Sequence, residues 1–134
     1  MKRLSVFLLL LLLLTGCEKQ PTQTQTDEPE TLSLPGKAYA AIFSNYNGSD
    51  LYWVARFKDG GKVEWSARSG SAYGTFINDV DVYPYTLKYP DITITRPSDG
   101  AVFRGAFVNF SLFRLTIRDY FGDYNTYEFV LLNE

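Results

Sequence analysis

The sequence of 134 residues contains no histidine, one cysteine and one methionine. Because histidine is the commonest general base, metal ligand and pH switch, its absence excludes Ser-His-Asp and Cys-His catalysis within this chain. A zinc site of cysteine and histidine is excluded for the same reason. A basic stripe of the kind that binds nucleic acid is also lacking. We therefore predict a protein that is not an enzyme, has no metal site or cofactor and binds no nucleic acid.

The single cysteine excludes an internal disulfide bond, so a folded domain has to be held together by side-chain packing. The residues that supply such packing are abundant, with 10 tyrosines, 10 phenylalanines and 2 tryptophans. Each aromatic side chain can bury a large apolar area. A domain of about 100 residues can form one compact core from them.

The longest apolar run lies at the N-terminus, in the stretch MKRLSVFLLLLLLLTGC. Lys2 and Arg3 precede an apolar run from Leu4 to Leu14, a length typical of the hydrophobic region of a secretory signal. The run is too short for a membrane-spanning helix, which needs about 20 apolar residues. It ends in Leu14-Thr15-Gly16-Cys17, and these four residues resemble the lipobox of bacterial lipoproteins.

The resemblance implies that residues 1–16 are a cleaved signal peptide and that the Cys17 thiol carries a diacylglycerol, with the new amine acylated as well. Two or more acyl chains make membrane anchoring stable. We therefore expect a lipid anchor in the bacterial cell envelope, at the outer membrane, on its periplasmic or its exposed side. An ordinary signal peptide with a chance cysteine is the alternative. Cleavage would remove Lys2 and Arg3 from 13 basic residues and none of the 15 acidic ones, so the net charge would change from −2 to −4.

Residues 17–30 are predicted to be the lipidated cysteine and a flexible linker. The segment after Cys17, EKQPTQTQTDEPE, has no large apolar residue. Such a composition cannot offset the entropy lost on ordering, so it favours a disordered tether. A recognition segment rich in threonine and glutamine is the alternative. The composition changes at Thr31, which places one folded domain at residues 31–134.

The clearest structural signal in that domain is a β-hairpin. Residues 51–58 and 62–68 each alternate between apolar and polar side chains, and Asp59-Gly60-Gly61 between them is typical of a hairpin turn. A three-residue turn keeps one face of the hairpin apolar, whereas a two-residue turn sets apolar against charged residues. The three-residue turn predicts three pairs: Phe57 with Val63, Ala55 with Trp65, and Trp53 with Ala67.

Other strands are expected at short intervals over residues 37–43, 73–77, 85–96, 101–108 and 110–118, and through Tyr127, Phe129 and Leu131. Within 85–96 the alternation shifts by one across Pro90-Asp91, which predicts a bulge or bend. No segment after Cys17 has a helical period. About seven or eight consecutive short strands predict an all-β domain, a small antiparallel up-and-down barrel, with a two-sheet sandwich as the alternative.

Residues 37–134 resemble the small lipocalin-like domains of bacterial envelope lipoproteins. The segments that carry the resemblance are FKDGGKV (57–63), YGTF (73–76), YTLKYPDITI (85–94), FRGAF (103–107) and FVLL (129–132). The resemblance implies a barrel that acts as a binding module for a small apolar ligand. A second likeness is fainter: SGSAY (69–73) is similar to the Ser-Gly-Ala-Arg-Tyr motif of lipoprotein lysozyme inhibitors.

Two groups of aromatic residues are candidate binding sites. Trp53 and Trp65, with other inward rings, either line a ligand pocket or fill the barrel as its core. The predicted aromatic turns, at 45–48, 83–85 and 120–124, either contact a glycan or an envelope protein or cap the barrel ends. From the last turn we single out Tyr120, Phe121 and Tyr124. The first group suggests a non-catalytic binding or structural module; the second suggests an inhibitor or a partner-binding or glycan-binding protein.

Polar clusters give weaker signals. The oxygen-rich stretches 45–50 and 78–81 could hold calcium, but turn chemistry explains the same residues without a metal. Carboxylates at Glu64, Asp79, Asp81 and Glu128 could in principle perform acid–base work. No spacing singles out a pair of them, so we expect a solvated surface.

Overall fold

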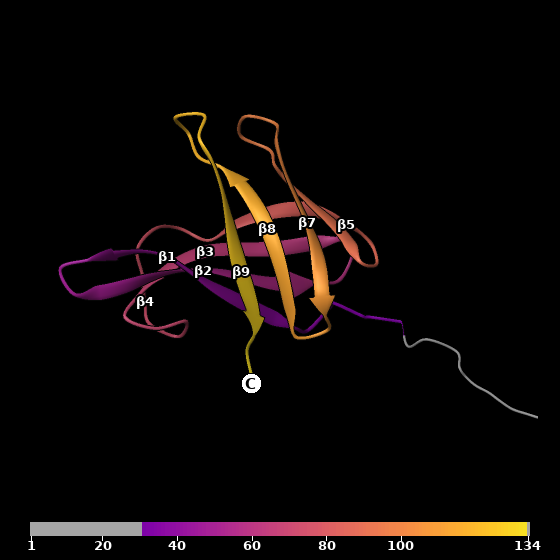
Figure 1. The fold of residues 1–134 in the computed structure, drawn as a ribbon, viewed down its shortest axis with the longest axis horizontal. Coiled ribbons are helices and arrows are strands. Elements are labelled where there is room, and N and C mark those ends of the chain that lie inside the picture. The colour runs from indigo at the N-terminus through magenta and orange to yellow at the C-terminus, as the bar shows by residue number, and fades with distance from the viewer. Residues whose placement is uncertain (1–30, 134) are drawn as a thin grey trace, which may run out of the picture. The chain divides into compact units, whose positions relative to one another are not determined.

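The computed structural model describes residues 31–133, and these fold into strands connected by turns and loops (Figure 1). Within this range no helix is long and apolar enough to cross a membrane. The predicted signal peptide, Cys17 and the linker up to residue 30 lie outside the described residues. The strands are β1 (Ala38–Tyr46), β2 (Ser49–Lys58), β3 (Lys62–Ser69), β4 (Thr75–Phe76), β5 (Asp81–Lys88), β6 (Asp91–Arg96), β7 (Ala101–Asn109), β8 (Leu112–Arg118) and β9 (Tyr124–Leu131).

The sheet closes on itself as an antiparallel barrel. Each strand from β5 to β8 pairs with the next along the chain, and β1 pairs with both β2 and β9. The pairings of β3 with β2 and with β5 complete the ring, while the short β4 is attached beside β3. Closure removes the sheet edges at which other chains could add a strand. The predicted all-β up-and-down barrel is thus confirmed.

The β2–β3 hairpin has the predicted register. Phe57 pairs with Val63, Ala55 with Trp65, and Trp53 with Ala67, so large and small side chains face each other on the inner side. The turn contains Gly60 and Gly61, with φ angles of 77° and 71°. These left-handed conformations favour glycine, which explains the Gly-Gly pair at this position.

The prediction of one bent strand over residues 85–96 is wrong. Two strands, β5 and β6, are joined there by a tight turn at Tyr89-Pro90, and Leu87 pairs with Ile92 across the hairpin. Leu87 and Ile92 face each other across the turn, and both point into the barrel. The shift in alternation therefore marks a reversal of the chain rather than a bulge. A proline has no N–H to donate to a sheet, which suits the turn. The expected aromatic turn at 83–85 lies instead within β5.

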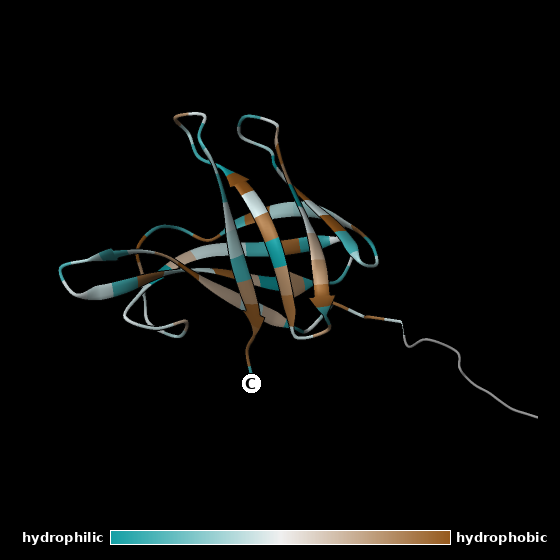
Figure 2. Cartoon of the chain, in the orientation of Figure 1, coloured by the Kyte–Doolittle hydropathy of each residue, from teal (hydrophilic) through white to brown (hydrophobic). Residues whose placement is uncertain are grey.

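Aromatic rings fill one end of the barrel interior. Phe113 and Phe129 stack at the centre with ring centroids 4.9 Å apart, and Tyr39 packs edge-on against Phe57 and Phe107. The Tyr39 hydroxyl donates a 2.7 Å hydrogen bond to the carbonyl of Phe110, and burial raises the pKa of Tyr39 to about 12. Figure 2 shows the alternation of apolar and polar residues along the strands that directs these rings inward.

The N-terminal segment of the domain completes this end. Leu32 and Leu34 are buried in the same core, and the N–H of Gly36 donates to the carbonyl of Phe57 at 2.9 Å. We call this region the closed end; it comprises residues 32–37 and the β2–β3, β5–β6 and β7–β8 turns. The opposite end, the mouth, comprises the β4–β5, β6–β7 and β8–β9 connections. The β6–β7 and β8–β9 loops project together beyond the strands (Figure 1).

Candidate functional site

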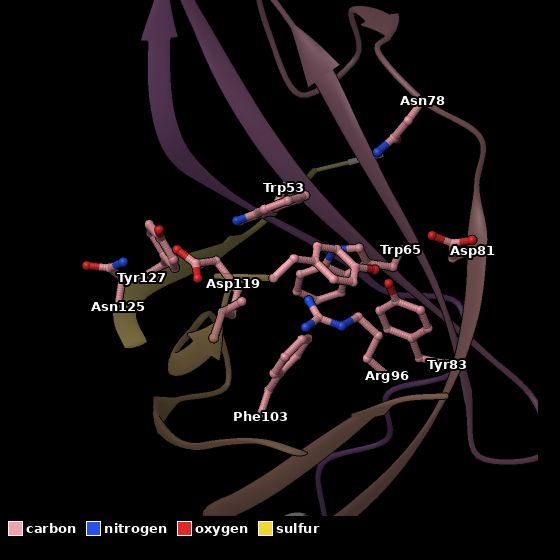
Figure 3. Close-up of a pocket in the computed structure, with 12 residues that line it drawn as sticks. Trp53, Trp65, Asn78, Asp81, Tyr83, Arg96, Phe103, Asp119, Asn125 and Tyr127 are labelled. Atoms are coloured by element: carbon pink, nitrogen blue, oxygen red, sulfur yellow. The ribbon is translucent and has the colours of Figure 1, made fainter. Parts of the chain in front are cut away.

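A pocket of about 130 Å³ opens at the mouth. Strands β2, β3 and β5 to β9 contribute to its wall, so that residues far apart in the sequence meet there (Figure 3). Its apolar surface consists of aromatic rings and one isoleucine, and its polar surface consists of amides, carboxylates and one guanidinium. The lining residues are Trp53, Trp65, Asn78, Asp81, Tyr83, Arg96, Phe103, Ile117, Asp119, Tyr120, Asn125 and Tyr127.

The aromatic wall is held in place by ring packing. Trp65 stacks on Tyr83 with centroids 5.8 Å apart and lies 5.6 Å from Trp53. Trp53 in turn stacks on Phe43 at 4.0 Å, with an angle of 18° between the ring planes. Phe103 packs below Trp65, with centroids 5.9 Å apart. Rings that pack on one another in this way offer a ligand rigid apolar faces at low entropic cost.

Arg96 places a cation inside this aromatic wall. Its side chain is 5% exposed, and Nε and Nη2 donate to Asp99 Oδ1 and Oδ2 at 3.0 and 2.7 Å. The guanidinium lies over the ring of Tyr120, 3.8 Å from the centroid. The hydrogen bond from Arg96 lowers the pKa of Asp99 to about 2, and the bond to Asp99 raises the pKa of Arg96. A charge that is paired and stacked in this way stays in one position.

Hydrogen bonds within and beside the β8–β9 loop hold Tyr120 over Arg96. The carboxylate oxygen Oδ1 of Asp119 accepts hydrogen bonds from the N–H groups of Phe121 and Asp123, both at 2.9 Å. Such a bond from a side chain to the backbone two residues on fixes a turn locally. Ser98 Oγ and the Tyr120 hydroxyl lie 3.5 Å apart and connect this loop to the β6–β7 loop. The roof of the pocket is therefore built from two loops that support each other.

One donor in the pocket region has no protein partner. The indole N–H of Trp53 is buried and finds no acceptor among the described residues. An unpaired buried donor carries a desolvation cost of about 1–3 kcal/mol, so an acceptor placed beside it would be favourable. Nearby, burial raises the pKa of the Tyr83 hydroxyl, and the carboxylate of Asp81 raises it further. The pocket thus combines apolar faces with both donors and acceptors.

The structure brings three of the five predicted binding residues together. Trp53, Trp65 and Tyr120 line the mouth pocket. Phe121 and Tyr124 lie outside it, with 93% and 66% of their surface exposed. Tyr124 borders a separate groove on the outer surface of β7 and β8. The pocket therefore draws on both groups of aromatic residues that the sequence analysis kept apart.

Sequence reasoning did not identify Arg96, Asp119, Asn125 or Tyr127 as pocket residues. A signal for Arg96 was present, because it continues the inward phase of Ile92 and Ile94 along β6. An arginine on an apolar face of a strand is an exception to the usual pattern of buried residues. The other three residues enter the pocket from the two ends of the β8–β9 loop, and their position depends on that turn.

The polar clusters occupy different sites. Asn45 donates to Asp50 Oδ1 at 3.0 Å, across the β1–β2 hairpin, whereas Asn78 and Asp81 line the mouth pocket. Glu128 pairs with Arg114 at 2.9 Å on the exposed surface.

Comparison of the chain with protein-family models, with curated proteins and with solved structures gives no match. The geometry of the pocket is therefore the starting point for a functional interpretation.

Proposed function

We propose that this chain is a bacterial envelope lipoprotein anchored through acyl groups on Cys17, and that its barrel is a non-catalytic binding module. The charged N-terminus, the apolar run and the lipobox-like LTGC sequence support the anchor. The closed barrel with a pocket at its mouth supports a binding role. A Cys17→Ser variant should leave the membrane fraction, and mass spectrometry of the N-terminal peptide should find acyl groups on the parent protein. A bare thiol would contradict the anchor.

The size of the pocket indicates a ligand no larger than a single ring. Cavities for drug-sized ligands measure about 300–1,000 Å³, whereas the mouth pocket measures about 130 Å³. The space below it is occupied by Phe103, Phe113 and Phe129, which are fully buried. A long acyl chain therefore has no path into the barrel. A single ring held between Trp53 and the polar side chains on the opposite wall fits this space.

The chemistry of the pocket favours one sugar ring of a glycan. A pyranose presents C–H groups, which suit the negative face of an aromatic ring, and hydroxyls that donate and accept hydrogen bonds. The wall offers the indole faces of Trp53 and Trp65 to the C–H groups of the sugar, and it offers planar polar groups such as Asn125 to the sugar hydroxyls. The buried, unpaired N–H of Trp53 is the observation that carries this assignment. A purely apolar ligand would leave it unpaired, at a cost.

Titration of the full chain with methyl glycosides of glucose and N-acetylglucosamine tests the assignment, with indole as the apolar probe. We expect a glycoside to shift the NMR resonance of the Trp53 indole N–H. Trp53→Phe keeps a ring but loses the donor, and should weaken binding by about two- to tenfold. Tyr46→Phe, on an exposed residue of β1, is the matched control. A shift with indole alone would favour an apolar ligand, and no shift with any probe would contradict a ligand pocket.

A second candidate function is partner binding through the β8–β9 loop. Phe121 is 93% exposed at its tip, and the hydrogen bonds to Asp119 hold the loop in one conformation. Exposed rings on a rigid loop are typical of interaction sites. A Phe121→Ala/Tyr124→Ala variant should lose capture of an envelope protein and keep glycoside binding. Tyr120 stays unchanged in this test because it also packs on Arg96.

A further inference from the structure

Charged side chains are divided between the two ends of the barrel. All four lysines of residues 31–133 lie at the closed end, on the N-terminal segment and on the ends of β2, β3 and β5; two aspartates, Asp59 and Asp91, lie near them. Five aspartates and two arginines, Arg96 and Arg118, lie at the mouth, on the connections that surround the pocket or on the strand ends next to them. The closed end is therefore the positive end. The lysines are Lys37, Lys58, Lys62 and Lys88, and the mouth aspartates are Asp79, Asp81, Asp99, Asp119 and Asp123.

Two of these lysines face each other directly. Lys58 and Lys62 are cross-strand partners in the β2–β3 hairpin, and the inward direction of Phe57 and Val63 turns both lysines outward. Like charges at such a position destabilise a hairpin. Neither lysine forms an ion pair within residues 31–133. An anionic surface against this end would offset the repulsion.

The closed end is also where the chain from Cys17 joins the barrel. Leu32 and Leu34 are the first buried residues, and both belong to the core at this end. At the same end, Tyr89 lies on the β5–β6 turn and Val108 near the end of β7, with 45% and 52% of their surface exposed. Lysine and tyrosine side chains with an apolar body and a polar tip suit a membrane–water interface. Charge, exposed apolar surface and chain connection thus coincide at one end.

We infer that the closed end docks on the anionic lipid headgroups of the membrane in which Cys17 is anchored, so that the mouth pocket faces away from the bilayer. This inference rests on the proposed lipid anchor. Lysines near an anionic bilayer are attracted to its negative surface potential, over a range set by the ionic strength. The aspartates at the mouth are repelled by the same potential. The pocket would then meet ligands from the aqueous side.

The acylated full chain can be tested in vesicles with site-specific labels. Acylation blocks the Cys17 thiol, so Val108→Cys and Phe121→Cys each introduce a single reactive thiol, one at the closed end and one at the mouth. Each variant is labelled with a fluorophore and reconstituted with phospholipids that carry a spin label on the headgroup. On vesicles rich in phosphatidylglycerol we expect several-fold stronger quenching at residue 108 than at residue 121. The difference should disappear on phosphatidylcholine vesicles and at high salt.

Charge variants test the cause of docking. Lys58→Gln/Lys62→Gln should lower the ratio of docked to free barrel about thirtyfold on anionic vesicles. Arg104→Gln/Arg114→Gln removes the same charge from the exposed barrel wall and should have little effect. Circular dichroism checks the fold of each variant. Lys88→Gln removes one positive charge from the closed end, and it should cause a smaller loss of docking than the lysine double variant.

Two outcomes would overturn the inference. One is equal quenching of the labels at residues 108 and 121 in acylated protein, and the other is an equal loss of docking in the lysine and the arginine double variants. Mass spectrometry of the same preparations separates this failure from that of the proposed function. A bare Cys17 thiol contradicts the lipid anchor itself, whereas an acylated Cys17 with equal quenching contradicts only the orientation.

Discussion

Removal of the Phe113 ring is the sharpest test of the filled barrel. Phe113 is fully buried and stacks on Phe129 with centroids 4.9 Å apart and ring planes nearly parallel. It also packs against Phe107, Tyr39 and Phe57 at 4.9, 5.1 and 6.4 Å. Phe113→Ala therefore removes one ring from the centre of a cluster of five. The surrounding barrel strands are hydrogen-bonded on both sides, so they can relax only partly into the space.

The expected loss of stability follows from this position. Truncation of a buried phenylalanine to alanine costs about 3–5 kcal/mol. A change of 1 kcal/mol shifts the melting temperature of a domain this size by about 4–8 °C, so Phe113→Ala should lower it by about 12–40 °C. Val130→Ala, on the exposed face of β9, should change stability by less than about 0.5 kcal/mol. Phe113→Leu should lie between the two and stay folded if the alanine variant does not.

Urea denaturation followed by circular dichroism measures these differences, and benzene adds a second readout. An apolar cavity left by truncation stays dry and can bind benzene, so benzene should raise the melting temperature of Phe113→Ala through binding to the folded state. It should leave the parent protein unchanged. Equal stability of Phe113→Ala and Val130→Ala would refute the packed interior. An equal benzene effect on parent and variant would show that the barrel already has room for an apolar ligand.

Three further predictions concern strand packing and ionisation. Gly105→Ala should destabilise the barrel strongly in urea denaturation, because a Cβ at Gly105 would lie 2.0 Å from a carbonyl oxygen of β8. The Arg96–Asp99 pair should support stability above pH 3.8, the ordinary pKa of Asp99, and lose this effect as the pH falls through about 2; Asp99→Asn should abolish that pH dependence in denaturation curves between pH 2 and 5. Tyr39 should ionise only near pH 12 in an absorbance titration, so its contribution to stability is present below pH 10 and declines as the pH rises toward 12. Tyr39→Phe should lose about 1 kcal/mol with the hydrogen bond to Phe110. Because the chain has 10 tyrosines, the titration of Tyr39 is read from the difference between the absorbance curves of the parent and of Tyr39→Phe, and a difference centred near pH 10 would contradict the assignment.

The alternation of apolar and polar side chains was sufficient to predict most of the strands and the register of one hairpin. The two-residue period decides which face of a strand is buried, and the Gly-Gly turn allowed one pairing of β2 with β3 that keeps the tryptophans inward. The same local rule failed at Tyr89-Pro90. A change in alternation marks a break in a strand, but it does not distinguish a bulge from a reversal of the chain.

The tertiary structure decided which residues meet at each end of the barrel and whether the inward rings fill its interior. Barrel closure depends on the pairing of β1 with β9, residues nearly a hundred positions apart. Closure sets which turns share an end, and so it brings Trp53, Arg96 and Tyr120 to one pocket and every lysine of the described domain to the opposite end. It also decides whether inward rings line a cavity or fill it, because the interior volume depends on strand number and tilt. Neither property is encoded in the period of a single strand.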